Sequence, residues 1–110
     1  MPIPPDWVIF KGLDDKKNEA QMKRVLLTIS GKVQGVCFRR YSQLKANELG
    51  LTGYAKNLED GRVMILLQGG GSAVDRFIAW SEQGSPQSVV DNVLVEEDEA
   101  DEIYLDFSVY

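Results

Sequence analysis

The 110-residue sequence predicts an α+β domain in which an antiparallel sheet carries two helices on one face. Three observations support this prediction. Several short stretches alternate apolar and polar residues, as strands with one buried face do. Two longer stretches carry apolar residues at helical spacing and are followed by glycine. Strand-like and helix-like stretches also interleave along the chain, with a hairpin signal at Asp60-Gly61.

The first part of the domain is expected to hold a strand followed by a helix. Lys23–Ser30 alternates regularly, so every second residue would lie on a buried face. Phe38–Leu49 contains no proline or glycine, and several of its apolar residues can share one helix face. Gly50 supplies the C-terminal stop, because glycine readily adopts the left-handed conformation that ends helices.

A hairpin and a second helix are expected next. A strand over about Thr52–Asn57 and another over Arg62–Gln68 should pair as antiparallel neighbours, since Asp-Gly is typical of a tight turn. Ser72 is the predicted N-cap of a helix that runs to about Ser81, before a Gly-Ser-Pro break.

The last part predicts two further strands, at about Val89–Glu97 and Ile103–Tyr110. The resulting β-α-β-β-α-β order, with an extra C-terminal strand, is that of a ferredoxin-like two-layer sandwich. Its face without helices, the open face, is expected to present Met64 and Leu66. We expect a monomer, with the open face as the place where copies could associate or where Trp7–Phe10 could lie as a cover.

Length and composition indicate a single domain of ordinary globular composition, 44% hydrophobic and 26% charged. Residues 1–21 hold three of the four prolines and show no sustained periodicity, so we expect an irregular or partly ordered N-terminal extension before a domain at residues 22–110. The apolar run Trp7–Phe10 is too short for a secretory signal, and no run reaches the roughly 18 apolar residues of a membrane span. These features predict a cytoplasmic protein with no membrane partner.

Residue types and charges narrow the possible functions. The chain has no histidine and one cysteine, Cys37, so we expect neither a metal site nor a cofactor. Between Lys23 and Arg62 there are eight basic residues against three acids, whereas from Phe77 onward there are nine acids and no Lys or Arg. This distribution predicts a small anion bound by the first half and no nucleic-acid partner.

The segment GKVQGVCFRR at residues 31–40 is the expected anion site, because it leads into a helix N-terminus, where backbone N–H groups attract anions. Gly31 and Gly35 are expected to let the backbone approach the anion, and Arg39 to hold two phosphate oxygens. A Walker loop fits poorly, since Lys32 follows the first glycine. A cysteine phosphatase loop fits poorly as well, because Gln43 stands where an arginine would be needed, and Cys37 is read mainly as a small loop residue.

Together with GYAKNLEDGRV at residues 53–63, this segment resembles the two signature patterns of acylphosphatases. These patterns run Gly-x-Val-Gln-Gly-Val-x-Phe-Arg and Gly-x-Val-x-Asn-x-x-Asp-Gly-x-Val. The resemblance extends from Lys23 to Tyr110 in the same order. It implies a ferredoxin-like fold and the metal-independent hydrolysis of a small-molecule acyl phosphate to a carboxylate and inorganic phosphate.

The resemblance also implies roles for individual residues. By motif position, Arg39 is the phosphate-binding catalytic arginine and Asn57 positions the attacking water. The loop amides that would cradle the phosphoryl group belong to Gln34, Gly35, Val36, Cys37 and Phe38. Inorganic phosphate or sulfate is expected to occupy the same loop. Tyr54, Ala55 and Met64 depart from the usual patterns without touching the two catalytic positions.

Two other functions remain open at this point. The chain could be a non-catalytic anion-binding or interaction module on the same fold, since ferredoxin-like scaffolds host many functions. The presence of Asn57 argues against this, because binding alone needs no water-orienting amide. A nucleic-acid binder on the open face is opposed by the acidic last third of the chain. Arg40 is expected to face solvent beside Arg39.

Overall fold

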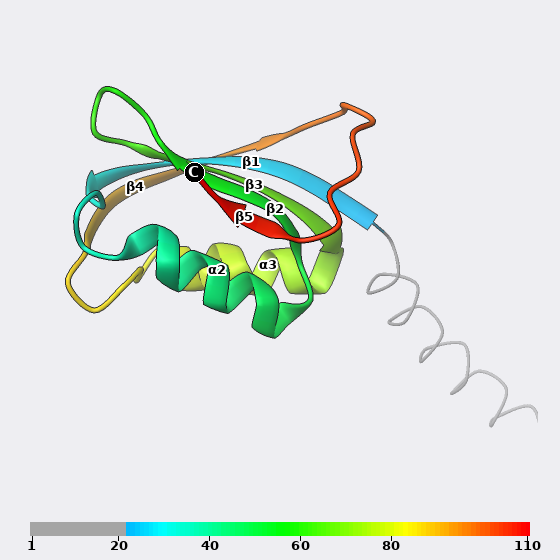
Figure 1. Ribbon diagram of the computed structural model, residues 1–110, viewed down its shortest axis with the longest axis horizontal. Coiled ribbons are helices and arrows are strands. Elements are labelled where there is room, and N and C mark those ends of the chain that lie inside the picture. The colour runs from blue at the N-terminus through cyan, green and yellow to red at the C-terminus, as the bar shows by residue number, and fades with distance from the viewer. Residues whose placement is uncertain (1–21) are drawn as a thin grey trace, which may run out of the picture.

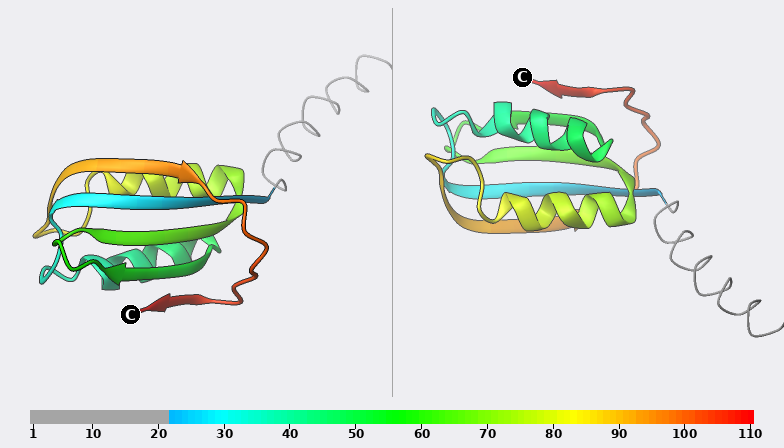
Figure 2. Two further views of the ribbon diagram at one scale, coloured as in Figure 1. Left: turned by 90° about the horizontal axis from the view of Figure 1, so that it is seen from above. Right: turned by 90° about the horizontal axis from the view of Figure 1, so that it is seen from below.

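The computed structural model describes residues 22–110; the predicted extension over residues 1–21 and its Trp7–Phe10 run lie outside the described part. Two helices pack on the same face of a five-stranded sheet (Figures 1 and 2), as predicted. No helix within residues 22–110 has the length and apolar character needed to cross a membrane. In chain order the elements are β1 (Met22–Lys32), α2 (Phe38–Leu49), β2 (Thr52–Asn57), β3 (Val63–Gly70), α3 (Gly71–Ser81), β4 (Val89–Glu97) and β5 (Phe107–Val109).

The sheet has the strand order β4-β1-β3-β2-β5. Its first four strands are antiparallel neighbours, but β5 pairs in parallel with β2, with Phe107 opposite Gly53. The prediction of an antiparallel sheet is therefore wrong for β5. The chain leaves β4 at one edge, passes around the end of the sheet and enters at the other edge alongside β2. The last strand is also shorter than predicted, because Ile103 and Leu105 are 77% and 90% exposed and lie in this connection.

Arg24 of β1 holds the connection between β4 and β5 against the sheet. Its Nε donates to Asp98 over 2.5 Å, Nη1 donates to the carbonyl oxygen of Glu102, and the guanidinium lies 5.4 Å from the ring centroid of Tyr104. The Tyr104 N–H donates to Gln68 of β3 over 3.2 Å. The hydrogen bond to Asp98 raises the pKa of Arg24, so the anchoring charge persists at every physiological pH.

The core lies between the sheet and the two helices. Alternate residues of β1 and β3 face it, and Phe38 of α2 and Phe77 of α3 fill it from the other side. Both phenylalanine rings pack on Trp80, with centroids 5.8 Å and 5.3 Å away. Burial of such a side chain stabilises the fold by roughly 1.5–3 kcal/mol, so the start of α2 is fixed by packing.

Met64 and Leu66 lie on the open face, as their alternation predicts, but Leu66 is only 2% exposed. Across the sheet it lies between Leu26 of β1 and Tyr54 of β2. Tyr54 in turn packs edge-on against Tyr104 of the β4–β5 connection, with ring centroids 5.7 Å apart. Neighbouring side chains therefore cover Leu66, while Met64 stays half-buried.

The helix ends match the sequence at one helix and differ at the other. Gly50, with φ 72°, ends α2 and donates its N–H to the carbonyl of Asn47 over 3.2 Å, as expected of a glycine stop. The predicted N-cap of α3 at Ser72 is wrong, since the N-cap is Gly70 and it makes no side-chain capping bond. The strand β3 continues to Gly70, opposite Met22, so the helix begins at once at Gly71.

Gly31 is required by a close approach of two strands. It has φ 125° and lies at a register shift between β1 and β4. A Cβ atom there would lie 2.1 Å from the carbonyl oxygen of Val89 and 2.8 Å from the nitrogen of Asp91. The close contact with the backbone of β4 thus requires glycine at this position, and the approach of Gly31 to an anion stays a prediction.

We expect Gly31→Ala to lower the free energy of unfolding by about 3 kcal/mol or more, because the new methyl group meets immovable backbone in a left-handed position. Gly50→Ala is the matched control, with φ 72° and nothing within 4 Å of its Cβ position, and should cost only about 1–2 kcal/mol. Urea denaturation followed by circular dichroism measures both. Equal losses would mean that β4 does not constrain Gly31.

Candidate functional site

Three connecting segments meet at one end of the molecule. Figures 1 and 2 show the loop between β1 and α2, the turn between β2 and β3, and the segment between α3 and β4 side by side at this end. The first of these segments leads into Arg39 in the first turn of α2. The second begins directly after Asn57, the last residue of β2. The fold therefore brings the elements of the two predicted catalytic residues to the same end.

The β1–α2 loop has the backbone shape of an anion cradle. Gly35 and Cys37 are both left-handed, with φ 74° and 61°. Left-handed residues that alternate with others in a loop are typical of the concavities that bind anions through backbone N–H groups. Among residues 22–110, no backbone hydrogen bond takes up the N–H groups of residues 34–37. These donors are therefore available to a bound anion.

The carbonyl groups of the loop, in contrast, are held by the protein. The Val36 carbonyl accepts a hydrogen bond from the buried Ser85 hydroxyl over 2.9 Å. The Cys37 carbonyl accepts from the N–H of Tyr41 over 3.0 Å, in the first turn of α2. Because these two carbonyl groups are hydrogen-bonded to other parts of the domain, the backbone of the loop is held in one conformation.

The side chains of the predicted loop residues divide into two groups. Val36 is 6% exposed and Phe38 is 1% exposed, so both point into the core and can offer a ligand only their backbone N–H. Cys37 and Gly35 are exposed, and Gln34 is half-buried. The loop is therefore anchored by two apolar side chains, and its polar backbone is left at the surface.

Arg39 is half-buried, and its guanidinium lies against the end of β5. Its Nη1 donates to the carbonyl oxygen of Tyr110. Within the described residues this contact takes one of the five N–H donors of the guanidinium, so the others remain for a ligand. Gln43, one turn along the same helix, donates to the Phe107 carbonyl over 3.0 Å and ties α2 to β5.

The sequence did not predict the contact with Tyr110. The acceptor is a main-chain oxygen, which every residue carries, so no side-chain pattern points to it. Arg40, by comparison, lies where expected: it is exposed and donates to the side chain of Gln43 over 2.9 Å.

Asn57 is exposed at the end of β2, opposite Val63 of β3. Its side chain has no hydrogen-bond partner in the part of the chain that the structure describes, so donor and acceptor are both available to water. The tight turn that follows is closed by the Leu58 N–H, which donates to the Arg62 carbonyl over 2.8 Å. Asp60 accepts the Arg62 N–H over 3.1 Å, and this bond lowers the pKa of Asp60, which strengthens the turn at neutral pH.

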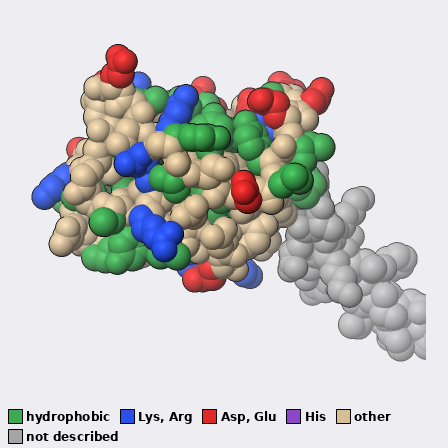
Figure 3. Space-filling model, in the orientation of Figure 1, with side chains coloured by type: hydrophobic (Ala, Val, Ile, Leu, Met, Phe, Trp, Pro, Cys, Tyr) green, Lys and Arg blue, Asp and Glu red, His purple; other side chains and the backbone are tan. Residues whose placement is uncertain are grey.

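The surface charge is unevenly distributed. Figure 3 shows acidic side chains gathered over the β4–β5 connection, with others at the tip of the β2–β3 turn, while Lys and Arg side chains are spread over the rest of this face. In residues 22–110, no group of His, Cys, Asp and Glu side chains is placed to hold a metal ion.

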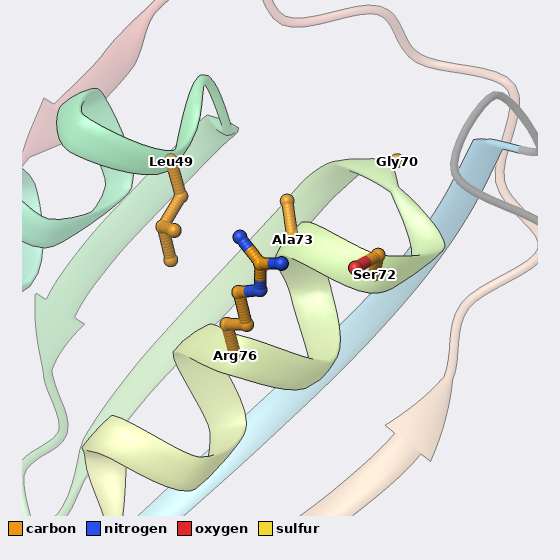
Figure 4. Close-up of a pocket in the computed structure, with 5 residues that line it drawn as sticks. All are labelled: Leu49, Gly70, Ser72, Ala73 and Arg76. Atoms are coloured by element: carbon orange, nitrogen blue, oxygen red, sulfur yellow. The ribbon is translucent and has the colours of Figure 1, made fainter. Parts of the chain in front are cut away.

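A surface pocket of about 280 Å³ lies elsewhere, between the last turn of α2 and the first turn of α3. It is lined by Leu49, Gly70, Ser72, Ala73 and Arg76, and the Arg76 side chain extends toward Leu49 and Ala73 (Figure 4). None of the predicted site residues lines it. The candidate site is instead an open cradle on the surface.

This arrangement can bind a phosphoryl group and hold water beside it. The loop N–H groups and Arg39 can surround the phosphoryl oxygens, and the amide of Asn57 can both donate to and accept from a water molecule. Such an arrangement can act on a phosphoryl group through positioning and charge stabilisation.

Comparison with known proteins identifies close relatives. A family model described as acylphosphatase matches residues 25–109. An acylphosphatase of Shewanella amazonensis is 57% identical over 88 residues, covering 80% of this chain and 97% of that protein. An acylphosphatase of Shewanella oneidensis is 53% identical over 88 residues, covering 80% and 98%. The structure of an acylphosphatase from Coxiella burnetii aligns with a TM-score of 0.79 at 40% identity, over 86% of this chain and 98% of that one.

We expect Ser85→Ala to weaken the cradle, because the buried Val36 carbonyl would lose its hydrogen bond. The free energy of unfolding should fall by about 1–3 kcal/mol, and the affinity for inorganic phosphate, measured by calorimetry, should fall several-fold. Ser88→Ala is the control, since the Ser88 hydroxyl donates only to the Ser85 carbonyl, which keeps the bond from the Ser88 N–H. An unchanged phosphate affinity in Ser85→Ala would show that this bond does not shape the cradle.

Proposed function

The chain belongs to the acylphosphatase family, enzymes that hydrolyse acyl phosphates, and we propose that Arg39 and the N–H groups of residues 34–38 bind the phosphoryl group while Asn57 positions the attacking water. The observation that carries this proposal is the cradle itself. The carbonyls of Val36 and Cys37 are held by Ser85 and Tyr41, and the loop N–H groups have no backbone partner among the described residues. The loop also leads directly into the helix turn that holds Arg39.

Binding of the phosphoryl group would use both parts of the loop. The N–H groups and the N-terminal end of α2 favour negative charge, and the guanidinium of Arg39 can hold two oxygens in a fork. The main-chain oxygen of Tyr110 holds one N–H of that guanidinium. These donors are fixed before the substrate arrives, so the charge on the equatorial oxygens is stabilised without rearrangement of the protein.

Asn57 would align the water with the bond that breaks. Its side-chain oxygen can accept a hydrogen bond from the water, and its NH₂ group can donate to a phosphoryl oxygen. The water oxygen forms the new bond to phosphorus as the bond to the acyl oxygen breaks, and one water proton passes to a phosphoryl oxygen, so that the products are a carboxylate and dihydrogen phosphate. The leaving carboxylate is a weak base, so it needs no general acid, and a protein without histidine can perform the step.

The alternative of a non-catalytic anion-binding module is not favoured, because relatives up to 57% identical are named acylphosphatases. Inorganic phosphate, a product of the reaction, is proposed to compete for the same loop, and sulfate should do so as well. The monomeric state, the cytoplasmic location and the lack of nucleic-acid and membrane partners stay predictions of the sequence.

We expect Arg39→Ala and Asn57→Ala each to lower kcat/KM for benzoyl phosphate by roughly 10²–10³, by analogy with loss of one preorganised donor. Arg39→Ala should also weaken phosphate binding, whereas Asn57→Ala should lower mainly kcat. Arg40→Ala is the matched control, because its side chain is exposed and pairs with Gln43 instead of the loop. A rate for Asn57→Ala equal to that of Arg40→Ala would refute the water-positioning role.

We expect the rate to be independent of metal ions, because positioning by N–H groups and a guanidinium replaces the charge that a metal would supply. Phosphate release from benzoyl phosphate should be unchanged after dialysis against a chelator. Loss of activity on chelation, with recovery on addition of a divalent cation, would contradict the proposed mechanism.

A further inference from the structure

We propose that the side chain of Gln34 is a positioning residue that sets the phosphate loop at a fixed distance from Asn57. This inference rests on the proposed roles of Asn57 and the loop, and it adds a role for a side chain that the signature pattern assigns only as part of a cradle of backbone amides. Gln34 is half-buried at the second position of the loop that connects β1 to α2.

The geometry is a single NH₂ group shared between two carbonyl groups. The Nε2 atom of Gln34 donates to the Leu58 carbonyl over 2.8 Å and to the Arg62 carbonyl over 2.9 Å. Both acceptors are peptide groups of the turn between β2 and β3. A primary amide has two N–H bonds, so both contacts can form at once.

The orientation of this amide is fixed by its surroundings. If the oxygen and nitrogen of the Gln34 amide were exchanged, its oxygen would face two carbonyl oxygens with no proton between them. The two acceptors also belong to the bonds that close the turn, since the Leu58 carbonyl accepts from Gly61 and the Arg62 carbonyl accepts from Leu58. Gln34 therefore binds the turn at its two ends.

These two ends flank the residue that is proposed to position water. Leu58 directly follows Asn57, and Arg62 directly precedes Val63, which pairs with Asn57 across the hairpin. The side chain of Gln34 thus connects the loop that carries the phosphate donors to the peptide groups on both sides of the Asn57–Val63 pair. The hydrogen bond from Ser85 fixes the loop toward the other side, through the Val36 carbonyl.

The two tethers have different consequences. Without Gln34, the Ser85–Val36 bond and the packing of Phe38 still hold the cradle, so the phosphate donors keep their relative positions. The turn that follows Asn57, however, then loses its tie to the loop, so the end of β2 can shift relative to the phosphate donors. When a reaction depends on the in-line approach of a nucleophile, displacement of the nucleophile by about 1 Å is enough to lower the rate strongly.

The test uses Gln34→Met, which keeps the length of the side chain and removes its hydrogen bonds. We expect kcat for benzoyl phosphate to fall by roughly 10- to 100-fold, while the inhibition constant for inorganic phosphate stays within about twofold of the wild-type value. Gln34→Asn keeps an amide on a side chain that is one methylene shorter, too short to reach both carbonyls. It should show the same pattern, and it serves as the second variant if Gln34→Met does not fold.

A double-mutant cycle distinguishes positioning from general stabilisation. In an Asn57→Ala background, Gln34→Met should have little further effect on kcat, because the group that it positions is gone. An equal loss in both backgrounds, or a parallel rise in the phosphate inhibition constant, would overturn the inference. Failure of the proposed function is a different result: Asn57→Ala alone would then keep the wild-type kcat.

Thr52→Val is the control for loss of a hydrogen bond in the same hairpin. The Thr52 hydroxyl donates to the Gln68 carbonyl over 3.4 Å, at the other end of the hairpin from Asn57. We expect this variant to keep the wild-type kcat. A fall in kcat as large as that of Gln34→Met would show that loss of any hydrogen bond in this hairpin impairs activity, and would also overturn the inference.

Discussion

The loop between β1 and α2 can offer its N–H groups to an anion only because other parts of the chain hold its remaining groups. The side chains of Val33 and Val36 in the loop and of Phe38 after it are buried in the core, and the carbonyls of Val36 and Cys37 accept bonds from Ser85 and from the first turn of α2. The left-handed conformation of Cys37 costs roughly 1–2 kcal/mol for a residue with a side chain, and this packing sustains it. The conformation of the loop therefore depends on the packing of the core next to it.

A second set of contacts controls Arg39 from the opposite direction. Arg24 holds the connection that carries the chain from β4 to β5, and β5 brings the Tyr110 carbonyl to the guanidinium of Arg39. The hydrogen bond between Gln43 and Phe107 keeps the same strand close to α2. Residues at both ends of the domain thus contribute to the position of one side chain in its first helix.

Local sequence patterns predicted most of the fold. They failed where the structure depends on contacts between residues that are far apart in the sequence. The alternation at Lys23–Ser30, the Asp60-Gly61 turn and the glycine stop at Gly50 each depend on a few neighbouring residues, so the sequence shows them directly. The parallel pairing of β5 depends on how a loop passes around the sheet, and residues such as Ile103 alternate without being buried. The signature patterns pointed to Arg39 and Asn57, but the role of Gly31 depends on the backbone of β4, which no local pattern describes.

The contact between Arg39 and β5 also has a thermodynamic consequence. A strand of three residues at the edge of a sheet opens at a lower free energy than the whole domain, because few hydrogen bonds and one buried side chain, Phe107, hold it. When β5 detaches, the guanidinium of Arg39 loses its main-chain partner and Phe107 leaves the core, while the loop before α2 keeps its bond from Ser85. With Arg39 in the proposed role, the fraction of molecules that hold this guanidinium in place is set by the local opening equilibrium of the strand as well as by the global stability of the protein.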